Sequence, residues 1–163
     1  MKKTPKNRQE AELITTRRQQ SIEVGTEDTL QASIKKAFEE KYPEKIGRLF
    51  ATFQNPNGMK QHGIWIARGM VEGVSDMIFI SDNFEIVPIE IKHPDKLHKR
   101  DHIICQAKWM INNSRRGGFC TSVDMFFNII EGRSNGIDPK RVLEHMERFS
   151  TKSTIAFKDL LYL

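Results

Sequence analysis

The stretch 73–92, GVSDMIFISDNFEIVPIEIK, constrains the fold more than any other part of the chain. It holds two short apolar runs, at 77–80 and 85–92, which are joined by the sequence SDN at 81–83. Side chains of these three types bond to nearby backbone groups and favour turns, so the stretch predicts a β-hairpin. The rest of the chain is expected to be arranged around this hairpin.

The position of the turn determines which side chains face each other. If the turn is centred near Asn83, Asp76 lies opposite Glu90. Lys92 is two residues beyond Glu90 and therefore points to the same side of the sheet. One end of the hairpin thus gathers two carboxylates and a lysine. The alternate side chains are expected to point into the core: Val87, Ile89 and Ile91.

Pro88 is an irregularity inside the second apolar run, because proline has no N–H to donate to a sheet. Two arrangements are open. Either the missing donor faces an unpaired edge, or strand pairing begins only after this residue.

Two carboxylates and an ammonium group at one point suit phosphodiester hydrolysis with a divalent metal ion. Mg²⁺ and Mn²⁺ prefer oxygen ligands, and Mg²⁺ is usually held by one or two carboxylates together with water and phosphate oxygens. The lysine would orient or deprotonate the attacking water, or balance charge in the transition state. The alternative is a solvated surface ion pair, which would contribute little.

These residues and their surroundings resemble the PD-(D/E)XK nuclease superfamily, and within it the VRR-NUC family. The resemblance spans residues 27–118. It is carried by Glu27 with Leu30-Gln31, Asn55, Gly73-Val74-Ser75-Asp76, Ile89-Glu90-Ile91-Lys92 with Pro94, and Gln106. One departure is Ser75, which stands where the family often has proline.

The resemblance implies a restriction-endonuclease-like α/β core, in which helices flank a central mixed β-sheet. It also implies a nuclease that cuts DNA with Mg²⁺ or Mn²⁺. Lys92 would be the catalytic lysine and Gln106 an accessory residue of the catalytic site. The implied metal ligands are Asp76, Glu90, the backbone carbonyl of Ile91, and Glu27, which is also an acidic residue of the catalytic site.

An amphipathic helix is predicted from Thr26, its N-cap, to about Lys41, before Pro43. Glu27 then lies in the first turn, where the helix dipole alone favours an acid. Its role in the site therefore depends on the resemblance, and Glu39 and Glu40 at the far end are rivals.

A second helix is predicted over 98–116, closed by Gly117-Gly118. Gln106 lies at the edge of its apolar stripe, where it either holds a water or phosphate oxygen or is an ordinary boundary residue. His98 and His102 would share one face at the spacing of a zinc-protease helix. The glutamate of that motif is missing and no third ligand is evident, so zinc is disfavoured.

The remaining segments complete a mixed α/β pattern. We expect one domain over 26–163, with core motifs at 27–118 and a C-terminal extension at 119–163, preceded by a basic, flexible arm at 1–25. Within it we expect a strand at 46–54, one or two buried strands at 119–130, a helix from Asp138-Pro139, and either a strand or a short helix at 153–163.

The 163 residues carry a net charge of +5, most of which lies in the first twenty residues. This suits a polyanionic partner, although a solvated terminus would explain the charge equally well. The expected nucleic-acid contacts are Lys60, His62, Arg68, Arg115 and Arg116. No run approaches membrane-spanning length and no signal peptide is visible, so we expect an intracellular protein, in the cytoplasm, nucleoid or nucleus, that does not bind membranes.

The expected function is therefore a Mg²⁺- or Mn²⁺-dependent DNA endonuclease. A small domain without an obvious sequence-reading module favours structure-selective cutting of branched or flapped duplexes, or nicking, by a homodimer. The main alternative is a non-catalytic or partner-activated nucleic-acid-binding module on a nuclease-like scaffold. An RNA nuclease and a small interaction protein with a basic arm are further alternatives.

Overall fold

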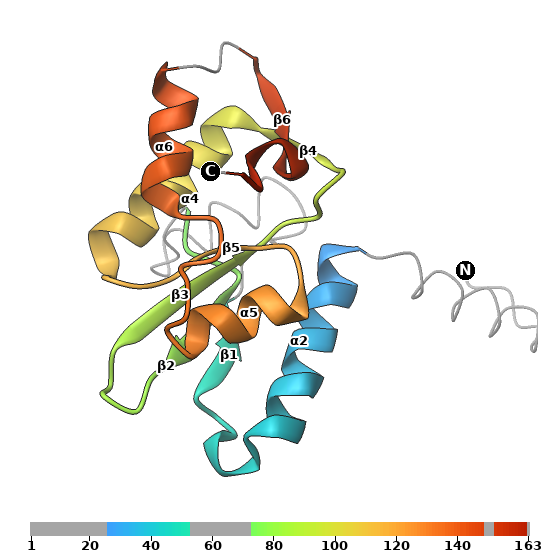
Figure 1. Ribbon diagram of the computed structural model, residues 1–163, viewed down its shortest axis with the longest axis vertical. Coiled ribbons are helices and arrows are strands. Elements are labelled where there is room, and N and C mark those ends of the chain that lie inside the picture. Colours follow the sequence, from blue (N-terminus) through green and yellow to red (C-terminus); the bar gives the residue numbers. More distant parts are fainter. Residues whose placement is uncertain (1–25, 53–72, 149–151, 163) are drawn as a thin grey trace, which may run out of the picture.

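A computed structural model of the chain describes residues 26–52, 73–148 and 152–162. It is a mixed α/β fold, as predicted, around a four-stranded sheet of strand order β1-β2-β3-β5 (Figure 1). The strands are β1 (Leu49–Ala51), β2 (Met77–Ile80), β3 (Ile86–Ile91) and β5 (Gly118–Cys120). β1, β2 and β3 pair antiparallel, whereas β5 runs parallel to β3. The strand predicted at 46–54 is shorter than expected, because a turn at Gly47, with φ of 92°, precedes it.

The predicted register of the hairpin is confirmed. Met77 lies opposite Ile89, so Asp76 and Glu90 fall at the next position of the same ladder. Pro88 lies opposite Ile78 within the pairing, so pairing does not begin after it. β5 begins only opposite Ile89. The Lys92 N–H donates to the Cys120 carbonyl oxygen of β5, and every second residue of a strand directs its N–H to the same side. The nitrogen of Pro88 therefore faces the β5 side of β3, at a position that β5 does not reach, so the missing donor costs no hydrogen bond of the sheet.

The turn between β2 and β3 places Phe84 in an unusual conformation. Ser81 closes the turn: its N–H donates to the Glu85 carbonyl oxygen, and its own carbonyl accepts from the Phe84 N–H, both at 3.0 Å. Phe84 has a φ of 60°, the left-handed conformation that glycine usually holds in such three-residue loops. This conformation costs a residue with a side chain about 1 kcal/mol.

Helices α2 (Glu27–Lys41) and α5 (Val123–Ile130) cover one face of the sheet (Figure 1). α2 begins and ends where predicted, and the Thr26 hydroxyl accepts a bond from the Thr29 N–H at 3.2 Å. A short 3-10 helix, η1 (Pro43–Lys45), follows it. Of the one or two buried strands predicted at 119–130, β5 confirms one at the start of this range. The rest of the range is α5 and not a strand, because Ser122 caps the helix and the apolar residues that follow share one helical face.

On the other side of the sheet, α4 (Arg100–Asn113) packs against β3, and α6 (Pro139–Arg148) packs against α4. Beside them lies a small sheet of β4 (Leu97–Lys99) and β6 (Thr154–Ala156), followed by η2 (Phe157–Leu160). The last segment is thus both strand and short helix.

The predicted start of the second helix at residue 98 was wrong. His98 lies in β4, opposite Ile155, and α4 starts at Arg100. His98 and His102 therefore do not share a helix face, which removes the zinc-protease spacing. The cause is long-range pairing of β4 with β6, which the local sequence does not reveal.

None of the helices within 26–52, 73–148 and 152–162 combines the length and apolar character needed to cross a membrane.

Candidate active site

The end of the hairpin brings Asp76, Glu90 and Lys92 together. The Lys92 Nζ donates to Glu90 Oε1 at 2.6 Å, and the Asp76 N–H donates to Glu90 Oε2 at 3.1 Å. The Ile91 N–H donates to Asp76 Oδ2 at 2.9 Å. Glu90 is 0% exposed and Lys92 only 4%. The alternative of a solvated surface ion pair was therefore wrong.

Gln106 belongs to the same cluster. It is buried on α4, and its Nε2 donates to Glu90 Oε1. Its own Oε1 is buried and accepts no hydrogen bond from the described residues. Buried polar atoms are usually paired, so this oxygen is free to accept from a bound water. The structure thus places Gln106 against the carboxylates instead of at an ordinary boundary position.

Burial dominates the electrostatics of the two hairpin carboxylates. It raises the pKa of Glu90 to about 8, although the Lys92 ammonium opposes the shift. Burial also raises the pKa of Asp76, against the charge of Lys92 and the Ile91 N–H. Two desolvated carboxylates share a single buried ammonium, so a further positive charge would stabilise their ionised forms.

Glu27 reaches the same end of β3 from the first turn of α2. The His93 N–H donates to its Oε1 at 3.2 Å, and the Lys96 Nζ lies 3.4 Å from its Oε2. Burial works against ionisation, but the His93 bond and nearby positive charges, Lys92 first among them, lower the pKa of Glu27 overall. Glu27 is therefore an ionised carboxylate whose charge also acts on Asp76.

The oxygen donors of this cluster fit a hard divalent cation in their chemistry, since the half-buried Asp76 and the buried Glu90 are adjacent carboxylates. They do not form a cluster of three side-chain ligands. Across the described residues, no group of three or more His, Cys, Asp or Glu side chains is arranged to hold a metal ion.

His98 was missed as a neighbour of the site. Its Nε2 lies 3.5 Å from Glu27 Oε1 and 3.3 Å from the His93 carbonyl oxygen, and its ring meets Phe157 edge-on. Burial lowers its pKa, despite the bond to His93. No sequence signal pointed to this position, because it depends on the β4–β6 pairing.

Two of the predicted nucleic-acid contacts, Arg115 and Arg116, lie away from this cluster. Arg115 and Arg116 follow α4, at the opposite end of β3 from Glu90. Arg116 donates to the Ile129 and Ile130 carbonyl oxygens at the end of α5, at 2.9 and 3.1 Å, whereas Arg115 is exposed. The other three lie outside the described residues: Lys60, His62 and Arg68.

Comparison of the chain with protein-family models, curated proteins and solved structures finds no match.

Proposed function

We propose that the chain is a Mg²⁺- or Mn²⁺-dependent DNA endonuclease with a restriction-endonuclease-like core. The observation that carries the proposal is the fully buried Glu90 carboxylate, which meets Asp76, Lys92 and Gln106 at one end of the hairpin. A buried carboxylate is costly unless its charge is matched. Such a cluster is better explained by a cation and a phosphate substrate than by stability.

Asp76, Glu90 and the Ile91 carbonyl oxygen would hold the divalent ion, with Glu27 as a further acidic group. Bound there, the ion would stabilise charge on the phosphoryl oxygens and lower the pKa of a water molecule.

The protein's own groups would prepare the nucleophile. Lys92, which Glu90 holds at 2.6 Å, would orient the attacking water or balance charge as it adds to phosphorus. The unpaired Oε1 of Gln106 would accept a hydrogen bond from that water and fix its direction. Burial of the cluster strengthens these interactions, because the local dielectric is low.

The proposed substrate is branched or flapped duplex DNA. The net charge of +5 suits a polyanion, and a domain of this size leaves little room for a separate sequence-reading module. A homodimer would allow both strands to be cut. The proposed substrate and the proposed homodimer are inferred from charge, size and analogy.

The test is a cleavage assay with Mg²⁺, Mn²⁺ or EDTA on linear duplex, single-stranded, flap and four-way-junction DNA, and on a matched RNA. We expect metal-dependent cutting that falls at least about a hundredfold in Asp76→Asn and in Lys92→Ala, as typical for loss of a charged catalytic group. The matched control is Asp82→Asn, an exposed hairpin carboxylate that pairs with Lys45 and Arg48. Cutting that survives Asp76→Asn would overturn the proposal.

One observation favours a second candidate, a nucleic-acid-binding module that does not cut by itself. The described residues include no three-ligand metal cluster. This candidate predicts DNA binding in EDTA, no cleavage of any of these substrates, and indifference to Asp76→Asn.

A further inference from the structure

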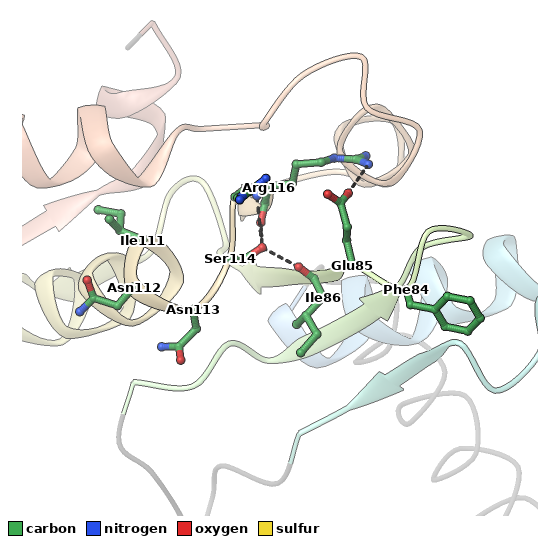
Figure 2. Close-up of a pocket in the computed structure, with 9 residues that line it drawn as sticks. Phe84, Glu85, Ile86, Ile111, Asn112, Asn113, Ser114 and Arg116 are labelled. Carbon is green, nitrogen blue, oxygen red and sulfur yellow. Dashed lines mark hydrogen bonds and ion pairs between the residues drawn. The ribbon is translucent and has the colours of Figure 1, made fainter.

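A separate pocket lies at the far end of β3, between the hairpin turn and the end of α4 (Figure 2). It is open to solvent and has a volume of about 560 Å³, within the range of pockets that hold small organic ligands. The described residues that line it include none of the carboxylates or the lysine of the candidate active site. The pocket therefore needs its own explanation.

Phe84 is the most informative residue of this pocket. Its backbone occupies a position that suits glycine, with φ of 60°, and its side chain is 81% exposed. Neither the geometry of the turn nor burial in the core accounts for an aromatic residue here. Strained residues of this kind often serve a ligand, and an exposed ring offers a face on which a nucleobase can stack.

The charged groups that line the pocket suit a nucleotide. Glu85 pairs with Arg116 at 3.6 Å, which offsets the negative charge that this glutamate brings to the pocket. Arg115 is exposed and makes no hydrogen bond or ion pair with the described residues, so its charge is available to a phosphate.

The amides of α4 complete the pocket. The Asn113 Nδ2 donates to the Trp109 carbonyl oxygen at 2.8 Å, which leaves its Oδ1 as an acceptor, and Asn112 is exposed. Figure 2 shows these two side chains on one side of Ile86 and the Phe84 ring on the other. An exposed aromatic ring together with donors and acceptors in one pocket is the combination by which proteins hold unpaired bases.

The pocket and the active site share one side of β3. Ile86 lines the pocket, and Glu90 is four residues further along, so their side chains point to the same face. Four residues of strand span about 13 Å. A stacked nucleic-acid strand rises about 3.4 Å per nucleotide, so a strand that passes around α4 would need at least about four nucleotides to join the two sites.

We propose that this pocket binds an unpaired nucleotide of a single-stranded segment, with the base on Phe84 and a phosphate at Arg115. The inference rests on the proposed function, and it names the substrate feature that the same enzyme selects: a single-stranded tail leading away from the scissile phosphate.

The test is binding in EDTA, by fluorescence anisotropy, of a labelled short oligothymidylate and of a blunt duplex. Phe84→Gly should weaken binding of the single strand by about five- to a hundredfold, as loss of one base–aromatic stack does. The melting temperature of the Phe84→Gly protein should not fall below that of the wild type, because glycine suits the left-handed backbone conformation at this position. Arg115→Ala should also weaken binding and reduce the slope of log affinity against log salt by about 0.7.

Two controls match these variants. Tyr162→Ala removes an aromatic side chain that is 96% exposed outside the pocket, and Arg148→Ala removes an exposed arginine of α6. Both should bind the single strand like the wild type. The inference is overturned if the wild type does not bind the oligothymidylate, if Phe84→Gly and Arg115→Ala bind it normally, or if both lose equal affinity for the blunt duplex.

Failure of this inference can be distinguished from failure of the proposed function. Binding that depends on Phe84, without cleavage of any substrate, would keep the pocket and remove the enzyme. Metal-dependent cleavage with no contribution from Phe84 would keep the enzyme and assign the pocket to something other than nucleic acid.

Discussion

The burial and hydrogen bonds of Glu90 indicate whether its cluster serves stability or function. Its side chain is completely buried, yet its three donors come from Lys92, Gln106 and the Asp76 backbone, and a second carboxylate is adjacent. Replacing a buried ion pair by apolar residues is often neutral or stabilising, so such a pair is weak evidence for a stabilising role. The arrangement is therefore a cost to stability, which the proposed cation would offset.

This cost predicts how stability depends on pH without divalent ions. Burial raises the pKa of Glu90 to about 8, and it also raises the pKa of Asp76, whereas the pKa of an unfolded glutamate is about 4.3. Between these values the folded state holds more protons than the unfolded state. The free energy of unfolding in EDTA should therefore fall as pH rises from about 5 to about 8.

Urea unfolding across this pH range provides the measurement. In Glu90→Gln the decline should be shallower, because the variant lacks the group with the largest shift, whatever its absolute stability. Exposed Glu44→Gln, in η1, is the matched control and should keep the wild-type slope. A wild-type stability that rises with pH over this range would contradict the prediction.

Among the secondary-structure elements, β5 links the core to the candidate active site. It pairs with β3 so that Phe119 lies opposite Glu90, and it is only three residues long. Gly118 allows this close packing, because a Cβ there would lie 1.9 Å from the Asn135 carbonyl oxygen. The backbone cannot yield as a flexible side chain would, so β5 has little tolerance for a larger residue.

Gly118→Ala should therefore lower the free energy of unfolding by at least about 2 kcal/mol, as overpacking typically does. Gly47→Ala provides the comparison, because Gly47 has a φ of 92° but a Cβ added there would meet no atom within 4 Å. It should cost only the strain of that conformation, about 1 kcal/mol. Urea midpoints of the two variants measure the difference, and equal losses would show that β5 is not packed as described.

The elements differ in how far the sequence predicts them. α2 and the hairpin carry local signals, and both formed as predicted. For α2 the signals are the Thr26 N-cap and apolar residues four positions apart, and for the hairpin the signal is the turn at 81–83. In the apolar run after residue 120, no comparable local signal distinguishes a strand from a helix. β4 depends on pairing with residues 154–156, so the place of His98 could not be inferred.

The candidate site shows the same division. The hairpin register brought Asp76, Glu90 and Lys92 together from turn geometry alone. The packing of α4 against β3, which presents Gln106 to Glu90, is a tertiary contact, and only the family resemblance suggested it. The neighbours of Glu27 likewise depend on where α2 meets the end of β3.

At the scale of the whole molecule, residues beyond 118 contribute to both apolar cores. Phe126 and Ile129 belong to the core between the sheet and helix α2, while Met146 and Phe157 belong to the core around α4 on the other side of the sheet. α4 also carries Gln106, so the segment after β5 packs against the helix that presents this residue to the candidate active site. We therefore expect the described parts of the chain to unfold as one cooperative unit.

The Phe157→Ala variant tests whether the described parts of the chain unfold cooperatively. Phe157 is fully buried, its ring lies 5.0 Å from that of Phe119, and it contacts His98 edge-on. Truncation should lower the free energy of unfolding by about 3–5 kcal/mol. Tryptophan fluorescence and far-UV circular dichroism should still report one coincident urea transition, because both cores share the same sheet.

Phe50→Ala on β1, where the side chain is 42% exposed, should cost less than about 1 kcal/mol. If Phe157→Ala instead produces a separate early transition while the rest of the sheet stays folded, the C-terminal segment is an independent layer. Gln106 would then owe its position to α4 and β3 alone. A single transition shifted to lower urea would mean that the Glu90 end of β3 and the distant C-terminal core are stabilised together. Mutations after residue 118 would then weaken the site without touching it.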